Sequence, residues 1–437
     1  MKNKFKYLSI LLCSSSLISC ADKVINKGEW LVVSNSTASV LTSTNIPVVP
    51  FNTVMTFKYF KNEKKTYEDN FDEKVKSIFL DQINSLHKLF DRHYNYKDED
   101  GNIITSIKVI NDSYGSNVPI KCDDKVYSLL KVGYDMTLET NGYFNFFVGK
   151  LNSFWDDIFY NVLDEGNDVH LYDPYYSQEQ NLEMLKYANA TPTMDEVKEL
   201  FTFNDEKKEI TFNAIDNKEY NGSILERNKV TSKYRPVITT GGIAKGLAVD
   251  YIKEKFLSLN YTDGVINAGS SSLASLTAPT FFEKGYQLFN FADPRTGNSI
   301  IRDIAFSLSV NYDYGISTSG NYNHNSYYIN TDDNNKLYRH HIINPYTGDC
   351  SQEHSSVTII SKTFSNAQLD ALSTMFVNLP LEQCFTYRNN LLAKYPDKDL
   401  SLIIMDTDKD NKLNIYIDSS LKKDVEIKAS NCKVYYE

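Results

Sequence analysis

The chain has 437 residues, of which 41% are hydrophobic and 23% are charged, a composition typical of a folded globular protein. This length is sufficient for one large domain or for two domains of ordinary size. The 46 basic and 56 acidic residues give a net charge of −10, and the sequence contains no basic cluster, which argues against nucleic acid as a main partner.

The first twenty residues have the pattern of a secretory signal. Lys2, Lys4 and Lys6 precede an apolar run that is too short to span a membrane, and a small residue comes directly before Cys20. The ending LISC resembles a bacterial lipobox, which implies that Cys20 carries lipid and anchors the protein at the extracytoplasmic face of the cell membrane. The alternative is an ordinary cleaved signal.

We expect a signal peptide over residues 1–19, a tether over residues 20–48 and a globular region over residues 49–437. The tether is rich in Ser, Thr and Asn, and Trp30 begins an apolar stretch that suggests an early strand within it. The globular region starts with an alternating, strand-like run at residues 51–60.

Further elements follow in chain order. Apolar residues at helical spacing predict helices at 70–90 and 125–140, and the second helix ends at an Asn-Gly pair suited to a C-cap. A Thr-Pro-Thr sequence followed by acidic residues predicts a helix start near residue 194. Strand-like runs lie at 236–238, 264–268, 356–360 and 400–405. Because helices and strands interleave without regular βαβ alternation, we expect an α+β fold of mixed sheets with packed helices.

The segment 240–246 (TGGIAKG) joins a strand-like run to a helix. A Gly pair at such a junction lets the backbone approach a ligand closely, and the helix N-terminus together with Lys245 favours a phosphate. The sequence is neither a Walker loop nor a G-x-G-x-x-G fingerprint, so a simple tight turn is the alternative.

Two later segments carry polar side chains between glycines or turns. Residues 315–320 (GISTSG) suit a strand that passes close to a ligand. His340 and His341 precede an Asn-Pro turn, and because neighbouring residues of a strand face opposite sides, the two histidines cannot hold one metal ion. One of them can act as an acid or base near neutral pH, or both can lie at the surface.

A further helix is predicted from Ser365 to Phe376. Asp370 and Thr374 are one turn apart, and a carboxylate and a hydroxyl are hard oxygen ligands that magnesium accepts. The alternative is a solvated helix face in which the Thr bonds to its own helix. The aspartates of residues 406–410 suggest a calcium loop, but Asn411 and Ile417 stand where that loop needs Gly and Glu, so a hairpin turn is expected.

In this order and spacing, the segments resemble the ApbE family of FAD:protein FMN transferases. The matching residues are GGIAKG at 241–246, Asp250, NAG at 267–269, TSG at 318–320, HIINP with TG at 341–348, and DALST at 370–374. Residues 51–53 and 142–145 also fit. The resemblance covers about residues 50 to 420.

The resemblance implies transfer of FMN from FAD to a Thr or Ser hydroxyl of an extracytoplasmic flavoprotein, with release of AMP and with Mg²⁺ bound. It implies that Asp370, Thr374 and a backbone oxygen of Gly242 hold the metal, and that His341 takes the proton of the incoming hydroxyl. The residues expected to contact FAD are Thr53, Tyr143, Phe144, Asn145, Thr239, Lys245, Thr318 and Ile342. FAD and metal are expected in a cleft between two lobes of one catalytic unit, with Asp370 lining that cleft rather than the core.

Several positions depart from the family pattern. Thr239, Asn145 and Asn344 stand where the family has Asp, Ser270 replaces a Gly, and Leu369 replaces a small residue. These departures leave open a lipoprotein that binds FAD, or hydrolyses it to FMN and AMP, without transfer. A solute-binding lipoprotein is a further alternative, but it requires two doubly wound lobes, and the sequence lacks that alternation.

Overall fold

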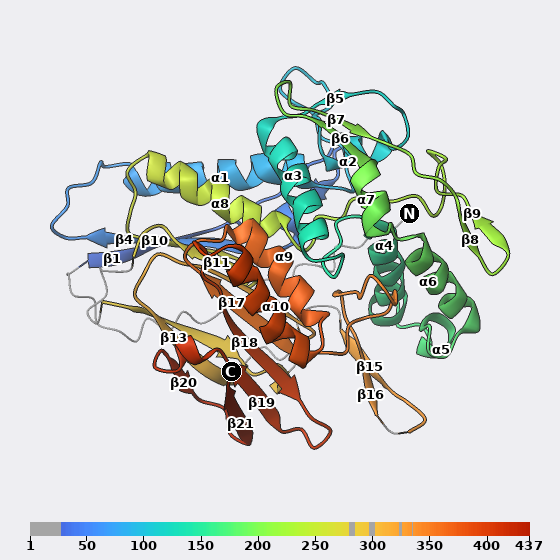
Figure 1. The fold of residues 1–437 in the computed structure, drawn as a ribbon. Coiled ribbons are helices and arrows are strands. Elements are labelled where there is room, and N and C mark those ends of the chain that lie inside the picture. Colours follow the sequence, from blue (N-terminus) through green and yellow to red (C-terminus); the bar gives the residue numbers. More distant parts are fainter. Residues whose placement is uncertain (1–27, 279–284, 297–301, 323–325, 334) are drawn as a thin grey trace.

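A computed structural model describes residues 28–278, 285–296, 302–322, 326–333 and 335–437 (Figure 1). The predicted signal peptide and Cys20 lie outside these residues. The centre of the fold is a nine-stranded sheet in which all neighbours are antiparallel except the last pair, β19 and β21, so the sheet is mixed. Its strands, in spatial order, are β1 (Gly28–Ser34), β4 (Met55–Asn62), β10 (Gly264–Ala268), β11 (Ser272–Ser275), β14 (Gly315–Gly320), β17 (Ser356–Ser361), β18 (Ser401–Thr407), β19 (Leu413–Ile417) and β21 (Cys432–Tyr436).

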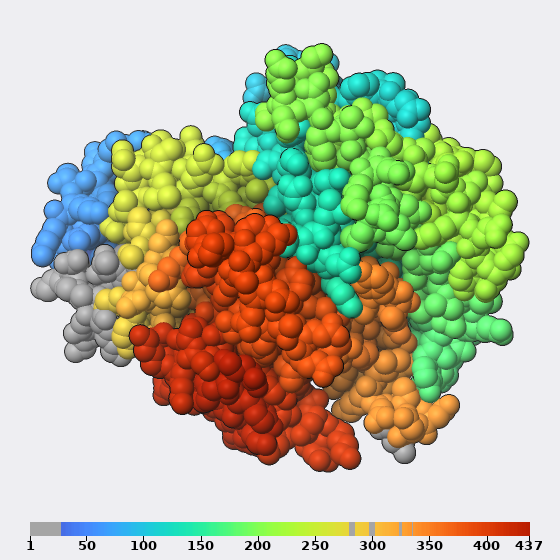
Figure 2. Space-filling view, viewed as in Figure 1, coloured from blue at the N-terminus to red at the C-terminus, as the bar shows by residue number. Residues whose placement is uncertain are grey.

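Helices cover one face of this sheet and form the main core with it. Alternate side chains of the central strands, such as Val357, Ile359 and Leu402, point toward the helices because successive residues of a strand face opposite sides. The α-helices among the described residues are α1 (Phe71–Phe90), α2 (Ile107–Asp112), α3 (Asp124–Glu139), α4 (Gly149–Phe159), α5 (Val169–Tyr172), α6 (Gln178–Ala190), α7 (Met194–Leu200), α8 (Ala244–Ser258), α9 (Asn366–Val377) and α10 (Leu381–Lys394). Figure 2 shows the teal surface around α3 between the orange-red α9–α10 surface and the green segment that includes α6 and α7.

A second core fills the opposite face. The other set of strand side chains, such as Ile316, Ile360 and Ile403, packs there with residues of a three-stranded sheet. Both faces of the central strands are therefore buried. The smaller sheets are β12 (Gln287–Ala292) with β13 (Ile304–Val310) and β20 (Val425–Ile427); β5 (Ile120–Lys121) with β7 (Glu209–Phe212) and β6 (Phe201–Asn204); β8 (Lys218–Tyr220) with β9 (Ser223–Leu225); β15 (Tyr327–Asn330) with β16 (Lys336–Arg339); and β2 (Val40–Leu41) with β3 (Pro47–Val48).

Most of the predicted elements are present. The expected α+β class with a large mixed sheet is confirmed, and the predicted helices at 70–90 and 125–140 are α1 and α3. Thr193 begins α7 with a capping box in which Glu196 is the partner. The aspartates around residue 408 lie in the hairpin between β18 and β19, as expected.

Two predicted features differ from the structure. The early strand expected within the tether is present as β1, but it pairs along its whole length with β4, so the residues of β1 belong to the central sheet and not to a tether. The run 236–238 does not form a regular strand, and only Val237 makes an isolated bridge, to Val148. The side chain of Asn111 bonds to the N–H and the carbonyl of Ile238 instead, which satisfies that backbone without a strand partner.

Candidate active site

Helices α8 and α9 cap each other. The carboxylate of Asp250 on α8 accepts hydrogen bonds from the N–H groups of Asn366 and Ala367, at 2.9 and 3.0 Å, at the start of α9. In return, Asp370 on α9 accepts the N–H of Gly246 in the first turn of α8 at 2.7 Å. Each carboxylate meets the unpaired amides and the positive dipole end of the other helix, which holds the two helix starts together.

Asp370 is buried, with 4% of its surface exposed. Besides the Gly246 N–H, its carboxylate accepts hydrogen bonds from the hydroxyls of Ser272 at 2.5 Å and Ser317 at 2.8 Å, which come from β11 and β14 of the sheet below. A Cβ on Gly315 would lie 2.7 Å from Asn366 Oδ1, so glycine at this position lets α9 lie close to the sheet. The expectation that Asp370 lines a cleft rather than the core is therefore wrong, because α9 is enclosed by the sheet and by α8.

Thr374 and Gly242 lie side by side, as the metal hypothesis requires. A Cβ on Gly242 would be 3.1 Å from Thr374 Oγ1 and 3.2 Å from the ring of Phe144, so the missing side chain leaves a small space between them. The Thr374 hydroxyl donates to the carbonyl of Asp370 at 3.0 Å. The hydroxyl is therefore bonded to its own helix, as expected in the alternative to a metal site. The lone pairs of its oxygen nevertheless stay available as acceptors.

Lys245 brings a positive charge to this group. Burial lowers the pKa of Lys245, and the charge of Asp370 opposes that change. Burial likewise raises the pKa of Asp370, against the effect of Lys245 and of the Ser272 and Ser317 hydroxyls. Lys245 and Asp370 are therefore close enough for the charge of each to affect the pKa of the other.

The segment after α3 carries the aromatic residues expected to contact FAD. Phe144 is buried against Gly242, whereas Tyr143 is half-buried and contacts the ring of Tyr346 with centroids 5.0 Å apart. The side chain of Asn145 accepts the N–H of Phe147 at 2.9 Å, so it serves the local turn. The Tyr346 hydroxyl donates to the carbonyl of Asn141, which joins this segment to the loop that carries the histidines.

The two histidines follow β16 and have different environments. His340 is buried, with Nε2 2.6 Å from the carbonyl of Ser351 and Nδ1 accepting the N–H of Ile342 at 3.3 Å. Burial lowers its pKa to about 4, so the ring is neutral at physiological pH and serves the structure. His341 is exposed and Ile342 is buried in the main core, so His341 is the histidine that solvent and substrates can reach.

The remaining predicted FAD contacts are spread around this centre. The N–H of Thr239 donates to the carbonyl of Phe146 at 2.8 Å, which places Thr239 beside the aromatic segment. Thr53 lies against the turn between β10 and β11, where a Cβ on Gly269 would be 2.3 Å from its hydroxyl. Thr318 is not brought together with Asp370, because its side chain bonds to Thr358 while its neighbours Ser317 and Ser319 face α9.

Four groups that build the centre have no role that the sequence alone predicts. Ser272, Ser317, Asp250 and the N–H of Gly246 all act through contacts between segments far apart in the chain. One signal was present in the sequence. Residues 366–377 contain a single charged side chain, Asp370, and a helix with so little polar surface is expected to be buried.

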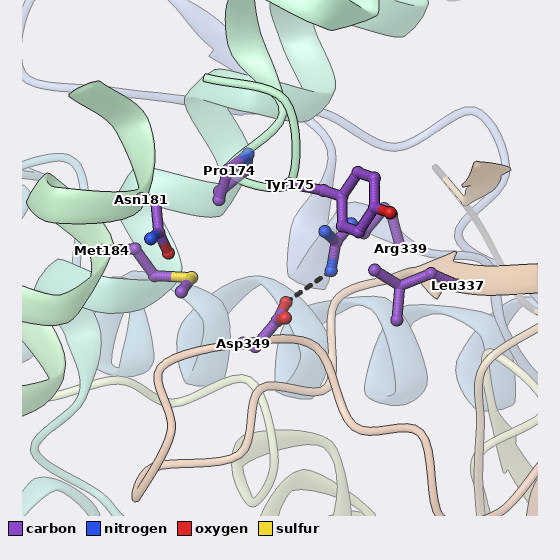
Figure 3. Close-up of a pocket in the computed structure, with 7 residues that line it drawn as sticks. All are labelled: Pro174, Tyr175, Asn181, Met184, Leu337, Arg339 and Asp349. Carbon is purple, nitrogen blue, oxygen red and sulfur yellow. Dashed lines mark hydrogen bonds and ion pairs between the residues drawn. The ribbon is translucent and has the colours of Figure 1, made fainter. Parts of the chain in front are cut away.

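A separate pocket of about 240 Å³ lies between the segment of α5–α6 and strand β16 (Figure 3). Its lining residues are Pro174, Tyr175, Asn181, Met184, Leu337, Arg339 and Asp349. Buried Arg339 pairs with Asp349 at 2.6 Å and with both oxygens of Asp173 at 2.8 Å, so its charge is neutralised within the protein. The pocket contains none of the predicted site residues, so the candidate active site is the group formed by Asp370, Thr374 and their neighbours.

Within the described residues, no cluster of three or more His, Cys, Asp or Glu side chains could bind a metal ion. The candidate metal ligands thus include only one carboxylate, and the others are a hydroxyl and a backbone carbonyl. In the same part of the chain, no helix has the length and apolar character that crossing a membrane requires.

Solved structures of similar fold include three ApbE proteins. The flavin transferase ApbE from Vibrio cholerae has a TM-score of 0.59 at 14% identity, covering 91% of this chain and 99% of that chain. The ApbE protein from Thermotoga maritima gives 0.52 at 20%, covering 83% and 93%, and the apo flavinyl transferase ApbE from Pseudomonas stutzeri gives 0.51 at 15%, covering 87% and 92%. At these identities the likeness shows the fold. No match was found among curated protein sequences.

The sequence itself decides the family. The sequence model of the ApbE family matches residues 51–395, which is most of the chain and includes the 239–246 turn, the His341 loop and helix α9. The family suggested by the motifs is thereby confirmed, and with it an enzymatic role. The chain belongs to the ApbE family, a family of flavin transferase enzymes.

Proposed function

We propose that this enzyme transfers FMN from FAD to a Thr or Ser hydroxyl of an extracytoplasmic protein, with Mg²⁺ bound at Asp370, Thr374 and Gly242. The observation that carries the proposal is the cluster itself: α8 and α9 bring one buried carboxylate, one hydroxyl and one glycine backbone together beside Lys245. The family membership supports FAD as the substrate.

The donor set fits a small hard cation. Asp370 Oδ2 accepts one N–H, at 2.7 Å, and a carboxylate oxygen has room for a second partner. The Thr374 oxygen keeps its lone pairs, and the absent side chain of Gly242 leaves the adjoining space open. Magnesium binds few protein ligands and keeps several waters, so one carboxylate with two neutral oxygens is a sufficient site.

In the proposed reaction, the acceptor hydroxyl oxygen forms a bond to the phosphorus on the FMN side of FAD, and the bond from that phosphorus to the bridging oxygen of AMP breaks. His341, the exposed histidine of the loop, would take the hydroxyl proton, and AMP would leave with the bridging oxygen. Bound Mg²⁺ would neutralise phosphate charge and position the pyrophosphate. Lys245, which interacts with the charge of Asp370, would be the basic residue beside the phosphates, and Tyr143 would offer an aromatic surface to the substrate.

The proposal includes the location of the enzyme in the cell. Lipidation at Cys20 would hold it at the extracytoplasmic face of the cell membrane, where its acceptor would be a flavoprotein with an accessible Thr or Ser. The lipobox-like ending of the first twenty residues supports this placement.

The test is to incubate the purified protein with FAD, MgCl₂ and an acceptor domain that carries a candidate Thr, and to record intact masses. The proposal expects the acceptor to gain the mass of one FMN, with loss of the product when EDTA is present. Matched reactions with His341→Gln, and with an acceptor in which the Thr is replaced by Val, identify the proton acceptor and the attacking hydroxyl.

Other outcomes have distinct meanings. Release of free FMN and AMP without a labelled acceptor would indicate FAD hydrolysis, the alternative raised by the departures at Thr239, Asn145 and Ser270. FAD binding without any cleavage would refute the proposed chemistry while leaving a flavin-binding role. Transfer that continues at full rate in EDTA would refute the metal.

A further inference from the structure

Asn378, at the C-terminal end of α9, contacts three parts of the active site at once. Its side-chain nitrogen lies 3.1 Å from the carbonyl of Tyr143, 3.2 Å from the carbonyl of Ile343 and 3.4 Å from the carbonyl of Thr374. Tyr143 belongs to the aromatic segment and Ile343 to the His341 loop. Thr374 belongs to α9, called the metal helix below because it carries the proposed metal ligands Asp370 and Thr374. The Asn378 side chain is 1% exposed.

The chemistry of the contacts fixes the orientation of this amide. All three neighbours are carbonyl oxygens, which only accept hydrogen bonds, so the atom facing them must be the NH₂ group. Its two hydrogens serve Tyr143 and Ile343, the two shorter contacts. Among the described residues, the Asn378 oxygen has no hydrogen-bond partner, so the side chain acts in this structure through its N–H donors alone.

A second bond holds the same loop to the same helix end. The Ser351 hydroxyl donates to the carbonyl of Val377 at 2.6 Å, and the Ser351 N–H bonds to the carbonyl of Ile342 at 3.0 Å. The C-terminal carbonyls of a helix lack partners within it, so such bonds also complete α9. The His341 loop is therefore attached to α9 through Asn378 and Ser351, whereas the Tyr143 segment is attached to the end of α9 through Asn378.

We propose that Asn378 is a positioning residue that sets the aromatic segment and the His341 loop at a fixed distance from the metal helix. This inference rests on the proposed function, since it assigns to those segments the binding of FAD and the transfer of the proton. Without the two N–H donors of Asn378, the carbonyls of Tyr143 and Ile343 would lose their hydrogen-bond partner, and the two segments would move apart. FAD binding and proton transfer would then both weaken while the metal ligands stay in place.

The test compares Asn378→Asp, which keeps the shape and removes both donors, with Asn378→Ala. The matched control is Asn213→Asp, since the amide of Asn213 also donates to a backbone carbonyl, that of Glu199 at 2.8 Å, at a site that contacts none of these segments. The Kd for FAD comes from flavin fluorescence, kcat and KM from FMN transfer, and amide hydrogen exchange is followed in peptides covering 141–145 and 341–344.

The inference expects faster exchange in both peptides, at least fivefold weaker FAD binding and at least tenfold lower kcat for Asn378→Asp, while the control stays within twofold of the parent. Exchange and kinetics within twofold of the parent would overturn it. Failure of both Asn378 variants to fold would overturn it too, because the residue would then determine the fold. If the parent itself does not transfer FMN, the proposed function fails separately, and unchanged exchange in both peptides would still refute the coupling.

Discussion

Replacement of Asp370 separates its structural role from its proposed metal role. In Asp370→Ala, the hydroxyls of Ser272 and Ser317 and the N–H of Gly246 lose their common acceptor. A buried donor without a partner costs about 1–3 kcal/mol, and Ser317 can turn to Ser373, which is 3.0 Å away. Two donors then stay unpaired, so we expect a loss of about 2–6 kcal/mol in the free energy of unfolding, a large part of the 5–15 kcal/mol typical of domains.

Asp370→Asn keeps the shape and one carbonyl oxygen. That oxygen can still accept the two Ser hydroxyls, but the new NH₂ group faces the N–H of Gly246, so only one contact is lost and the expected cost is about 1–3 kcal/mol. The folded Asn variant should nevertheless lose FMN transfer by at least a hundredfold, because a neutral amide is a poor magnesium ligand.

Urea unfolding followed by circular dichroism measures the first effect, and the mass assay measures the second. A suitable control is Asp195→Asn, an exposed carboxylate whose surface ion pair with Lys198 should leave the stability nearly unchanged. If Asp370→Ala were as stable as the parent, the buried-acceptor reasoning would be wrong. If Asp370→Asn transferred FMN at the parent rate, the metal assignment would be wrong.

Three further predictions concern stability. Burial lowers the pKa of His340 from 6.5 to about 4. The neutral ring therefore stabilises the fold fully above pH 6.5, and up to about 3 kcal/mol of the free energy of unfolding is lost as the pH falls toward 4. In urea unfolding, His340→Gln should show a flatter pH dependence of stability over this range. Burial raises the pKa of Glu196, but Arg227 and the Thr193 N–H outweigh burial and hold the pKa at about 2, below the ordinary value of 4.5. The stabilisation from this ion pair is therefore present above pH 4.5 and is lost as the pH falls toward 2. Glu196→Gln should remove this acid-dependent part of the free energy of unfolding, which solvent screening of the partly exposed pair reduces, and an unchanged acid titration would contradict the ion pair. In Gly246→Ala the new Cβ would lie 2.2 Å from the backbone oxygen of Asn366, so soluble yield and stability should both fall, and normal stability would show that α8 and α9 can separate there.

Local patterns predicted the elements well because the deciding information lies within each segment. The spacing of Val75, Phe79, Ile83 and Leu86 defines the buried face of α1, and all four side chains are fully buried. The capping box at Ser365 and Gln368 likewise places the start of α9 at the predicted residue. The hairpin after β18 follows from its Asp- and Asn-rich turn.

The contacts around Asp370 could not be predicted in this way. Ser272, Ser317 and Gly246 reach it from three other elements, and only the packing of the sheet and α8 against α9 decides that they meet. Thr318 illustrates the same limit on a single strand: the motif names the strand, but the face that each residue presents depends on register, and a shift by one residue exchanges the two faces.

The mutual capping of α8 and α9 also has a consequence for the order of folding. Asp250 and Asn366 are 116 residues apart, and Gly246 and Asp370 are 124 residues apart, so neither helix start is completed until most of the chain between them has been arranged. Contacts of such long sequence separation form slowly, because the entropy of closing the loop is lost before the contacts stabilise it. The proposed metal ligands and Lys245 should therefore come together in one late step, and a partly folded chain would lack the candidate active site.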